Sequence, residues 1–159
     1  MQVTQETVVS QYEWIQGRAG RTVEIINDVR GLLGPEFDTV VDPVTVQAYQ
    51  QEVDTIFADG DLAVNVTALV SILRGLNVQA DYPGFIVDEL LGRELAGMIA
   101  GRQPLRLLGE ATFHYADVHV DDDTHAGVDD LDAALAAGFQ TRLPGWEWTE
   151  RESPFAVVD

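Results

Sequence analysis

The stretch LAVNVTALVSILRGL, residues 62–76, is the one around which we expect the rest of the chain to be organised. Large apolar residues recur in it at steps of four and three, the spacing that lines one face of an α-helix: Leu62, Val66, Leu69, Leu73 and Leu76. Further apolar side chains widen that face over most of the circumference, so we predict a core helix that the rest of the fold surrounds. At fifteen residues, the stretch is shorter than the ~20 residues that a membrane span needs, so no membrane partner is expected.

The charge balance points to the solvent in which the protein works. The chain has 27 Asp and Glu against 9 basic residues, a net charge of -18, and every basic residue is Arg. In molar salt the Debye length falls to about 3 Å, which screens the repulsion between surface carboxylates. High acidity without Lys or Cys resembles proteins of salt-in haloarchaea or their viruses. We therefore interpret the acidity as an adaptation to salt, and nucleic acid is not an expected partner.

Upstream of the core helix, apolar residues keep a helical spacing from Thr4 to Leu33, with Gly17 and Gly20 in the middle. Glycine weakens a helix, so we expect a kink there or two helices that meet end to end. Three of the nine basic residues lie in this region and are candidate contacts for an anion or a partner: Arg18, Arg21 and Arg30. The alternative is that these arginines pair with the abundant acids of the chain itself or of a neighbouring subunit.

Three more helices are predicted beside these. Asp42 and Pro43 suit the start of one helix, whose buried stripe is formed by Val46, Tyr49, Val53 and Ile56. Another helix begins near Pro83 and ends at Gly101, and a short one runs from Asp129 to Gly138.

After Pro104 the period of the pattern changes. Residues 105–108 and 111–120 read as strands joined around Gly109, because the second is rich in β-branched and aromatic residues. The expected fold is therefore mainly α with a β element (α+β): a four- to five-helix bundle in one domain, 1–145, with a β-hairpin at about 105–120.

All three histidines lie in or just after that hairpin, where imidazole and carboxylate groups could hold zinc or another divalent ion. The candidate metal ligands are His114, His119, His125, Asp121 and Asp123. Strand geometry opposes the site, because His114 and His119 are five residues apart and would point to opposite faces unless a bulge lay between them.

The last residues, 146–159, interleave aromatic and apolar side chains with charges, which indicates an extended C-terminal arm. The arm either folds back over its own core or docks on another subunit, since exposed aromatic residues mark interfaces. The candidate interface residues are Trp146, Trp148, Phe155 and Val157 of the arm and Tyr115 of the hairpin.

The sequence offers no convincing catalytic set, because it has no Cys or Lys nucleophile, no phosphate-binding glycine loop and no nucleophile elbow. We expect no enzyme and no cofactor. A helical body with a hairpin and an aromatic arm resembles the head-to-tail connector, or adaptor, proteins of tailed viruses, in which a ring of copies joins the portal to the tail. The resemblance implies a homo-oligomer with portal and tail partners.

The same resemblance implies a virion protein that is assembled in the host cytoplasm. Residues 1–7 have neither the basic nor the apolar region of a secretory signal, so none is expected. The alternative interpretation is a cytosolic haloarchaeal domain that binds a protein or a small ligand without catalysis.

Overall fold

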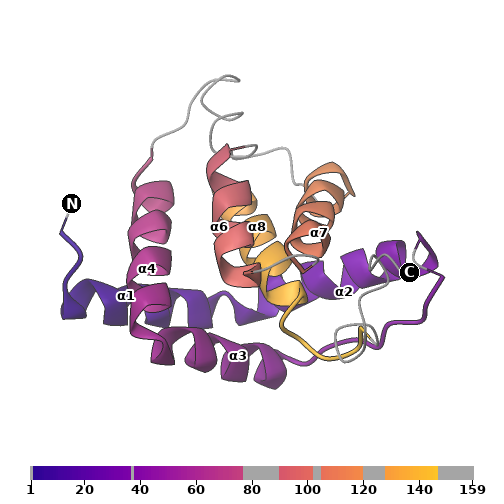
Figure 1. Cartoon of the computed structure of the whole chain (residues 1–159), viewed down its shortest axis with the longest axis horizontal. Coiled ribbons are helices and arrows are strands. Elements are labelled where there is room, and N and C mark those ends of the chain that lie inside the picture. The colour runs from indigo at the N-terminus through magenta and orange to yellow at the C-terminus, as the bar shows by residue number, and fades with distance from the viewer. Residues whose placement is uncertain (1, 37, 77–89, 102–104, 120–127, 147–159) are drawn as a thin grey trace, which may run out of the picture.

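The computed structural model describes residues 2–36, 38–76, 90–101, 105–119 and 128–146. Within these ranges the chain forms seven helices and no strand. They are α1 (Gln5–Gly17), α2 (Ala19–Glu36), α3 (Val46–Ala58), α4 (Gly60–Gly75), α6 (Arg93–Ala100), α7 (Leu105–His119) and α8 (Val128–Gln140). Figure 1 shows α1 and α2 as a long base with α3 beside it, and α4, α6, α7 and α8 standing across that base.

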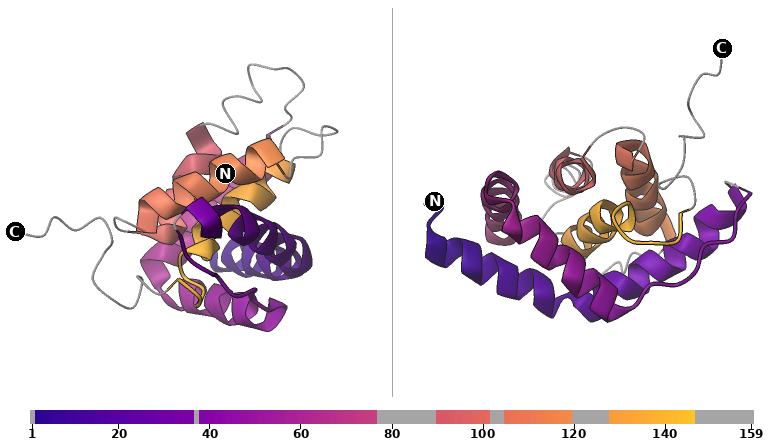
Figure 2. Two further views of the ribbon diagram at one scale, coloured as in Figure 1. Left: turned by 90° about the vertical axis from the view of Figure 1, so that its right-hand side faces the viewer. Right: turned by 60° about the horizontal axis from the view of Figure 1, so that its bottom comes forward.

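The predicted break in the first helix is confirmed. α1 ends at Gly17 and α2 begins at Ala19, with Arg18 between them, and Figure 2 shows that the two helices meet at an angle. A capping box fixes the start of α1, because Thr4 and Thr7 each accept a hydrogen bond from the backbone N–H of the other.

The start of α3 differs from the prediction. The helix begins at Val46, and Thr45 rather than Asp42 is its N-cap, accepting a hydrogen bond from the Ala48 N–H at 3.1 Å. The preceding residue, Val44, is held in a non-helical position by the Asn27 side chain, which bonds both its N–H and its carbonyl. The predicted buried stripe is confirmed at Tyr49, Val53 and Ile56, which are fully buried, but is wrong at Val46, which is 41% exposed in the first turn of the helix.

α4 is not the surrounded helix that its composition predicts. Its cap is Asp59, and one side of it packs inward through Ala63, Val66, Thr67, Val70 and Leu73. The opposite side is open, with Val64 46% and Ile72 42% exposed.

The central helix of the described fold is α8, which packs against α7, α6 and α2. Every residue from Leu131 to Thr141 is buried. The predicted end at Gly138 is wrong, because this residue lies inside α8 at its contact with α6. A Cβ atom at position 138 would lie 2.6 Å from Cβ of Ile99, so glycine is what permits the two helices to approach.

The predicted β-hairpin at 105–120 is wrong, because residues 105–119 form α7. The buried side chains follow a helical period: Leu108, Thr112, Phe113 and Ala116. In a strand, Phe113 would point to the opposite face from Thr112 and Ala116. Gly109 was expected at a turn. It lies within α7 and packs closely, since a Cβ there would be 3.4 Å from Cβ of Ala100 and from the carbonyl of Ala137. Packing on α6 and α8 therefore overrides the local β propensity.

Among the described residues, no single helix combines the length and apolarity of a membrane span, and α3 and α4 reach them only when counted together across a 108° bend.

Candidate functional site

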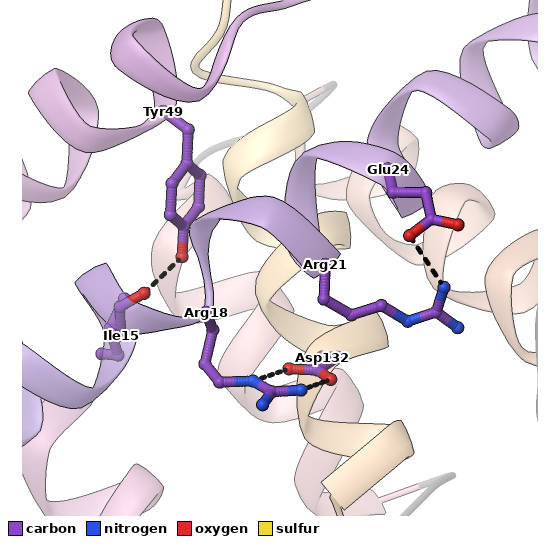
Figure 3. A network of polar contacts seen from close by, with 6 residues as sticks. All are labelled: Ile15, Arg18, Arg21, Glu24, Tyr49 and Asp132. Carbon is purple, nitrogen blue, oxygen red and sulfur yellow. Dashed lines mark hydrogen bonds and ion pairs between the residues drawn. The ribbon is translucent and has the colours of Figure 1, made fainter.

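The break between α1 and α2 is the first polar cluster of the structure (Figure 3). Arg18 reaches the first turns of α8, where its Nε donates to Oδ1 of Asp132 at 2.9 Å and its Nη2 donates to Oδ2. The Asp132 side chain is 2% exposed and that of Arg18 is 32% exposed. This bidentate pair joins helices that are 114 residues apart in the sequence, and it occupies both carboxylate oxygens.

Tyr49 completes the cluster from the side of α3. Its hydroxyl donates to the Ile15 carbonyl at 3.2 Å, and its ring packs edge to face on Phe139. Burial raises the pKa of the Tyr49 hydroxyl, so the group remains a neutral hydrogen-bond donor. The cluster thus connects the break between α1 and α2 to α3 and α8. The Arg18, Asp132 and Tyr49 side chains form hydrogen bonds within the chain.

Arg21 and Arg30 do not join Arg18 in one basic patch. Arg21 pairs with Glu24 one turn away on the same helix, at 3.3 Å. Arg30 is only 2% exposed. The alternative that the arginines pair with acids of the chain therefore holds for Arg18 and Arg21, and Arg30 is a core residue.

Arg30 connects three segments of the chain from the middle of α2. Its Nε donates to Oε1 of Gln140 at 2.6 Å, and its Nη1 donates to the carbonyls of Asp42 and Pro144, each at 2.7 Å. Its guanidinium lies 5.7 Å from the ring centre of Trp146. Burial lowers the pKa of Arg30 to about 10, with the charge of Asp42 opposing the shift.

The turn after α8 is shaped around that guanidinium. Gly145 has φ +118, and a Cβ there would lie 2.5 Å from Nη1 of Arg30. Nη2 of Arg30 is buried without a hydrogen-bond partner, and no described carboxylate forms an ion pair with the side chain. Arg30 therefore holds these segments together through hydrogen bonds to carbonyl groups and a cation–π contact with the Trp146 ring.

Of the candidate interface residues, Trp146 packs inside the chain. It is 1% exposed and lies near Arg30 and Gln140. Tyr115 is half-buried on α7, in edge contact with His114. Trp148, Phe155 and Val157 lie outside the described residues.

The candidate metal site is only partly within the described chain. His114 is exposed on α7 and position 119 is the last residue of that helix, while Asp121, Asp123 and His125 lie outside the described residues. Two positions five apart on a helix are turned by about 140° about its axis, so α7 itself does not align 114 with 119. No three His, Asp or Glu side chains in the described ranges are close enough to hold a metal ion.

The feature that sequence reasoning missed is the outward side of α4. We define the α4 outer stripe as Val64, Ala68 and Ile72, which follow one another at steps of four and share a face of α4, together with Leu76, the extended C-cap residue that follows the helix. Three of them are large and exposed: Val64 (46%), Ile72 (42%) and Leu76 (42%). Periodicity alone could not reveal the stripe, because α4 is apolar on both sides. Its signal in the sequence is the absence of charge from Leu62 to Leu73.

The remaining described surface carries most of the acids, together with single exposed apolar side chains at Val3, Val9, Leu32, Val40, Val46 and Leu90. The acids on α1, α2, α3 and α6 are mostly exposed, whereas Asp132 is the buried exception among those whose burial is described. The α4 outer stripe is therefore an apolar, uncharged surface on an otherwise strongly negative molecule.

In its described part the chain is an assembly of seven helices, of which α4 exposes an apolar face. The chain belongs to the family DUF7984, a domain of unknown function, whose match covers residues 1–159. Comparisons with curated proteins and with solved structures gave no match.

Proposed function

We propose that this protein is a non-catalytic structural assembly subunit that binds other protein subunits in concentrated salt. The observation that carries the proposal is the α4 outer stripe, with Val64, Ile72 and Leu76 exposed in a chain of net charge -18. Contiguous apolar surface marks interaction sites on soluble domains. An uncharged face is also where a highly acidic protein meets an acidic partner with least repulsion.

The salt requirement is supported by where the charges lie. With its acids exposed and without Lys, the chain repels itself at low ionic strength, and molar salt removes most of that repulsion. Salts that strengthen apolar burial would strengthen contact at the α4 outer stripe as well.

As the specific form of this function we propose a head-to-tail connector of a halophilic tailed virus, which forms a ring between portal and tail. The helical body supports this form, and residues 147–159 remain the proposed arm. The hairpin that also suggested the resemblance is the helix α7, so it contributes no support.

A second candidate is a cytosolic haloarchaeal domain that binds a different protein through the same stripe. The stripe favours both candidates equally, because it shows an interaction face and not the identity of the partner. Mass in solution distinguishes them: a connector forms a large homo-oligomer alone or on its portal, whereas the binding domain stays small.

The test is light scattering after size exclusion in molar KCl, over a range of protein concentrations. We expect the wild type to gain mass with concentration and Val64→Glu or Ile72→Glu to remain monomeric. Val9→Glu is the matched control, since Val9 is 49% exposed in the middle of α1. Equal self-association of Val64→Glu and wild type, or a wild type that neither self-associates nor binds a portal protein, would overturn the proposal.

A further inference from the structure

We propose that the guanidinium of Arg74, held at the end of α4 against the Trp14 ring of α1, binds a carboxylate of a partner protein. This inference rests on the proposed function, in which the protein binds other protein subunits, and adds a second contact with its chemistry. Arg74 lies four residues after the buried Val70 and bonds to α1, so this contact is separate from the α4 outer stripe.

Arg74 differs from the other arginines at the described surface. Five arginines that are at least partly exposed form ion pairs with an acid of the same chain: Arg18, Arg21, Arg93, Arg106 and Arg142. Among the described residues Arg74 forms none, although its side chain is exposed and the sequence has 27 acids. Partial burial lowers the pKa of Arg74 by desolvation, and no carboxylate of the described chain opposes that shift.

Two contacts hold the Arg74 guanidinium in place. Its Nη1 donates to Oε1 of Gln11 at 2.7 Å, and Nε2 of the same Gln11 donates to Oγ of Ser71 at 2.9 Å. Cζ of Arg74 lies 4.5 Å from the centre of the Trp14 ring, a cation–π contact. Because these contacts already fix the side chain, a further ligand would order it at little entropic cost.

The donors that remain on Arg74 are those that suit a carboxylate. With Nη1 bonded to Gln11, the Nε–H and Nη2–H groups have no acceptor among the described residues. We call these two groups the Arg74 fork; they lie in one plane and match the two oxygens of a carboxylate. Arg18, which also contacts the Trp14 ring, uses the same two groups to bind both oxygens of Asp132.

A single fork favours a carboxylate over a phosphate. A phosphate group carries close to two negative charges at neutral pH and is usually bound by several donors. The nearby cation Arg18 already has Asp132 on its fork, so Arg74 contributes one positive charge. One carboxylate neutralises that charge and accepts from both donors.

The strength of such a contact indicates that the carboxylate belongs to a protein. One exposed ion pair adds far less to a binding free energy than a millimolar affinity requires, so a free carboxylate would fill the fork only at roughly 0.1–1 M. An Asp or Glu side chain of a partner with other contacts would be held there more firmly. Molar salt screens the long-range repulsion between two acidic proteins, and the ion pair then contributes to the choice and orientation of the partner.

The test is the NMR signal of the Arg74 Nε–H group, assigned by its loss in Arg74→Lys or Arg74→Gln. The unmodified chain is titrated with potassium acetate in place of potassium chloride at constant molar potassium, at a mildly acidic pH that keeps acetate ionised. We expect a saturable downfield shift with a midpoint at roughly 0.1–1 M acetate. The Arg18 Nε–H signal is the internal control and should move several-fold less, because Asp132 already accepts its hydrogen bond.

A second titration tests whether a carboxylate on a polypeptide reaches the fork. Poly-L-glutamate at the same carboxylate concentration should shift the Arg74 signal at least as far as acetate does. If acetate shifts the signal and polyglutamate does not, or if acetate saturates below about 1 mM, the site serves a small molecule and the assignment to a partner protein is overturned. An Arg74 signal that moves no more than that of Arg18 overturns the carboxylate site itself.

The Val64→Glu variant separates this inference from the proposed function. If the Arg74 signal does not respond while Val64→Glu lowers the mass measured by light scattering, the proposed function stands and the Arg74 contact fails. If the wild type binds no protein and Val64→Glu changes nothing, the proposed function fails, and the assignment to a partner protein fails with it.

Discussion

Gly138→Ala tests the contact at the centre of the fold, where α8 crosses α6. A Cβ at position 138 would lie 2.6 Å from Cβ of Ile99, 3.0 Å from its Cγ2 and 3.2 Å from the Ala96 carbonyl oxygen. Non-bonded carbons prefer about 3.5–4.0 Å, so the two helices must separate by roughly 1 Å. Because the nearest atoms belong to a helical backbone and a branch point, a rotamer change cannot relieve the clash.

The magnitude is the balance of two terms. Overpacking of a core by one methyl group costs about 1–3 kcal/mol, whereas replacing a glycine by alanine inside a helix gains about 0.8–1.0 kcal/mol. We expect a net loss of about 0–2 kcal/mol for Gly138→Ala, and each kcal/mol should lower the melting temperature by about 2–4 °C.

The control is Gly31→Ala, in the interior of α2, where a Cβ would meet nothing within 4 Å. This variant should be more stable than the wild type by about 0.5–1 kcal/mol, from helix propensity alone. Thermal and urea unfolding followed by circular dichroism in molar KCl measures both. Combining Gly138→Ala with Ile99→Ala should cost less than the sum of the single changes. If Gly138→Ala is as stable as Gly31→Ala, the close approach of α6 and α8 is refuted.

Three further outcomes follow from the polar clusters. Asp132→Asn breaks the buried pair with Arg18 and should lower the free energy of unfolding by about 1–3 kcal/mol, whereas Glu24→Gln, on the exposed helical pair, should change it by less than about 0.5 kcal/mol. Arg30→Met removes the donor to the Asp42 and Pro144 carbonyls and leaves Gln140 Oε1 with its bond from Trp146, so it should cost about 2–4 kcal/mol by urea unfolding. An unchanged free energy of unfolding would mean that removal of the buried charge outweighs the loss of these bonds. Above pH 10 the unfolded chain loses the Tyr49 proton while the folded chain keeps it, so Tyr49→Phe should gain up to about 1.4 kcal/mol per pH unit relative to the wild type. The lowered pKa of Arg30, about 10, changes the free energy of unfolding in the opposite direction over the same range, because the folded state releases the Arg30 proton first. Both proteins share that contribution. A stability difference between Tyr49→Phe and wild type that is constant from pH 9 to 12 would contradict the burial of the Tyr49 hydroxyl.

The helices that could be predicted were those with strong local signals. The break near Gly17 was predicted correctly, because glycine marks it in the sequence. Three of the four residues of the predicted α3 stripe are buried, Tyr49, Val53 and Ile56, whereas Val46 in the first turn is exposed. α7 was not predicted correctly, since its β-branched and aromatic residues favour a strand in isolation. It is helical because Leu108, Phe113 and Ala116 then form one face against α6 and α8.

The candidate site was harder to predict than the fold. Arg18 was singled out, but its partner Asp132 is 114 residues away, and the only local sign was an acid in register with the buried Leu135 and Phe139 of α8. Arg30 was predicted to contact an anion or a partner at the surface, although it is buried in the core and connects three segments of the chain. Neither outcome could be derived locally, because both depend on which helices lie side by side.

What the sequence determined by itself is the strongly negative charge and most of the helices, since net charge, glycine breaks and helical periodicity are properties of the chain alone. The tertiary structure decided which side of each helix is buried. α4 is apolar around most of its circumference, so periodicity could not distinguish its buried Val66 and Val70 from its exposed Val64 and Ile72. α8 is rich in Ala, whose small apolar area gives a weak signal, yet it became the centre because small side chains allow helices to approach most closely.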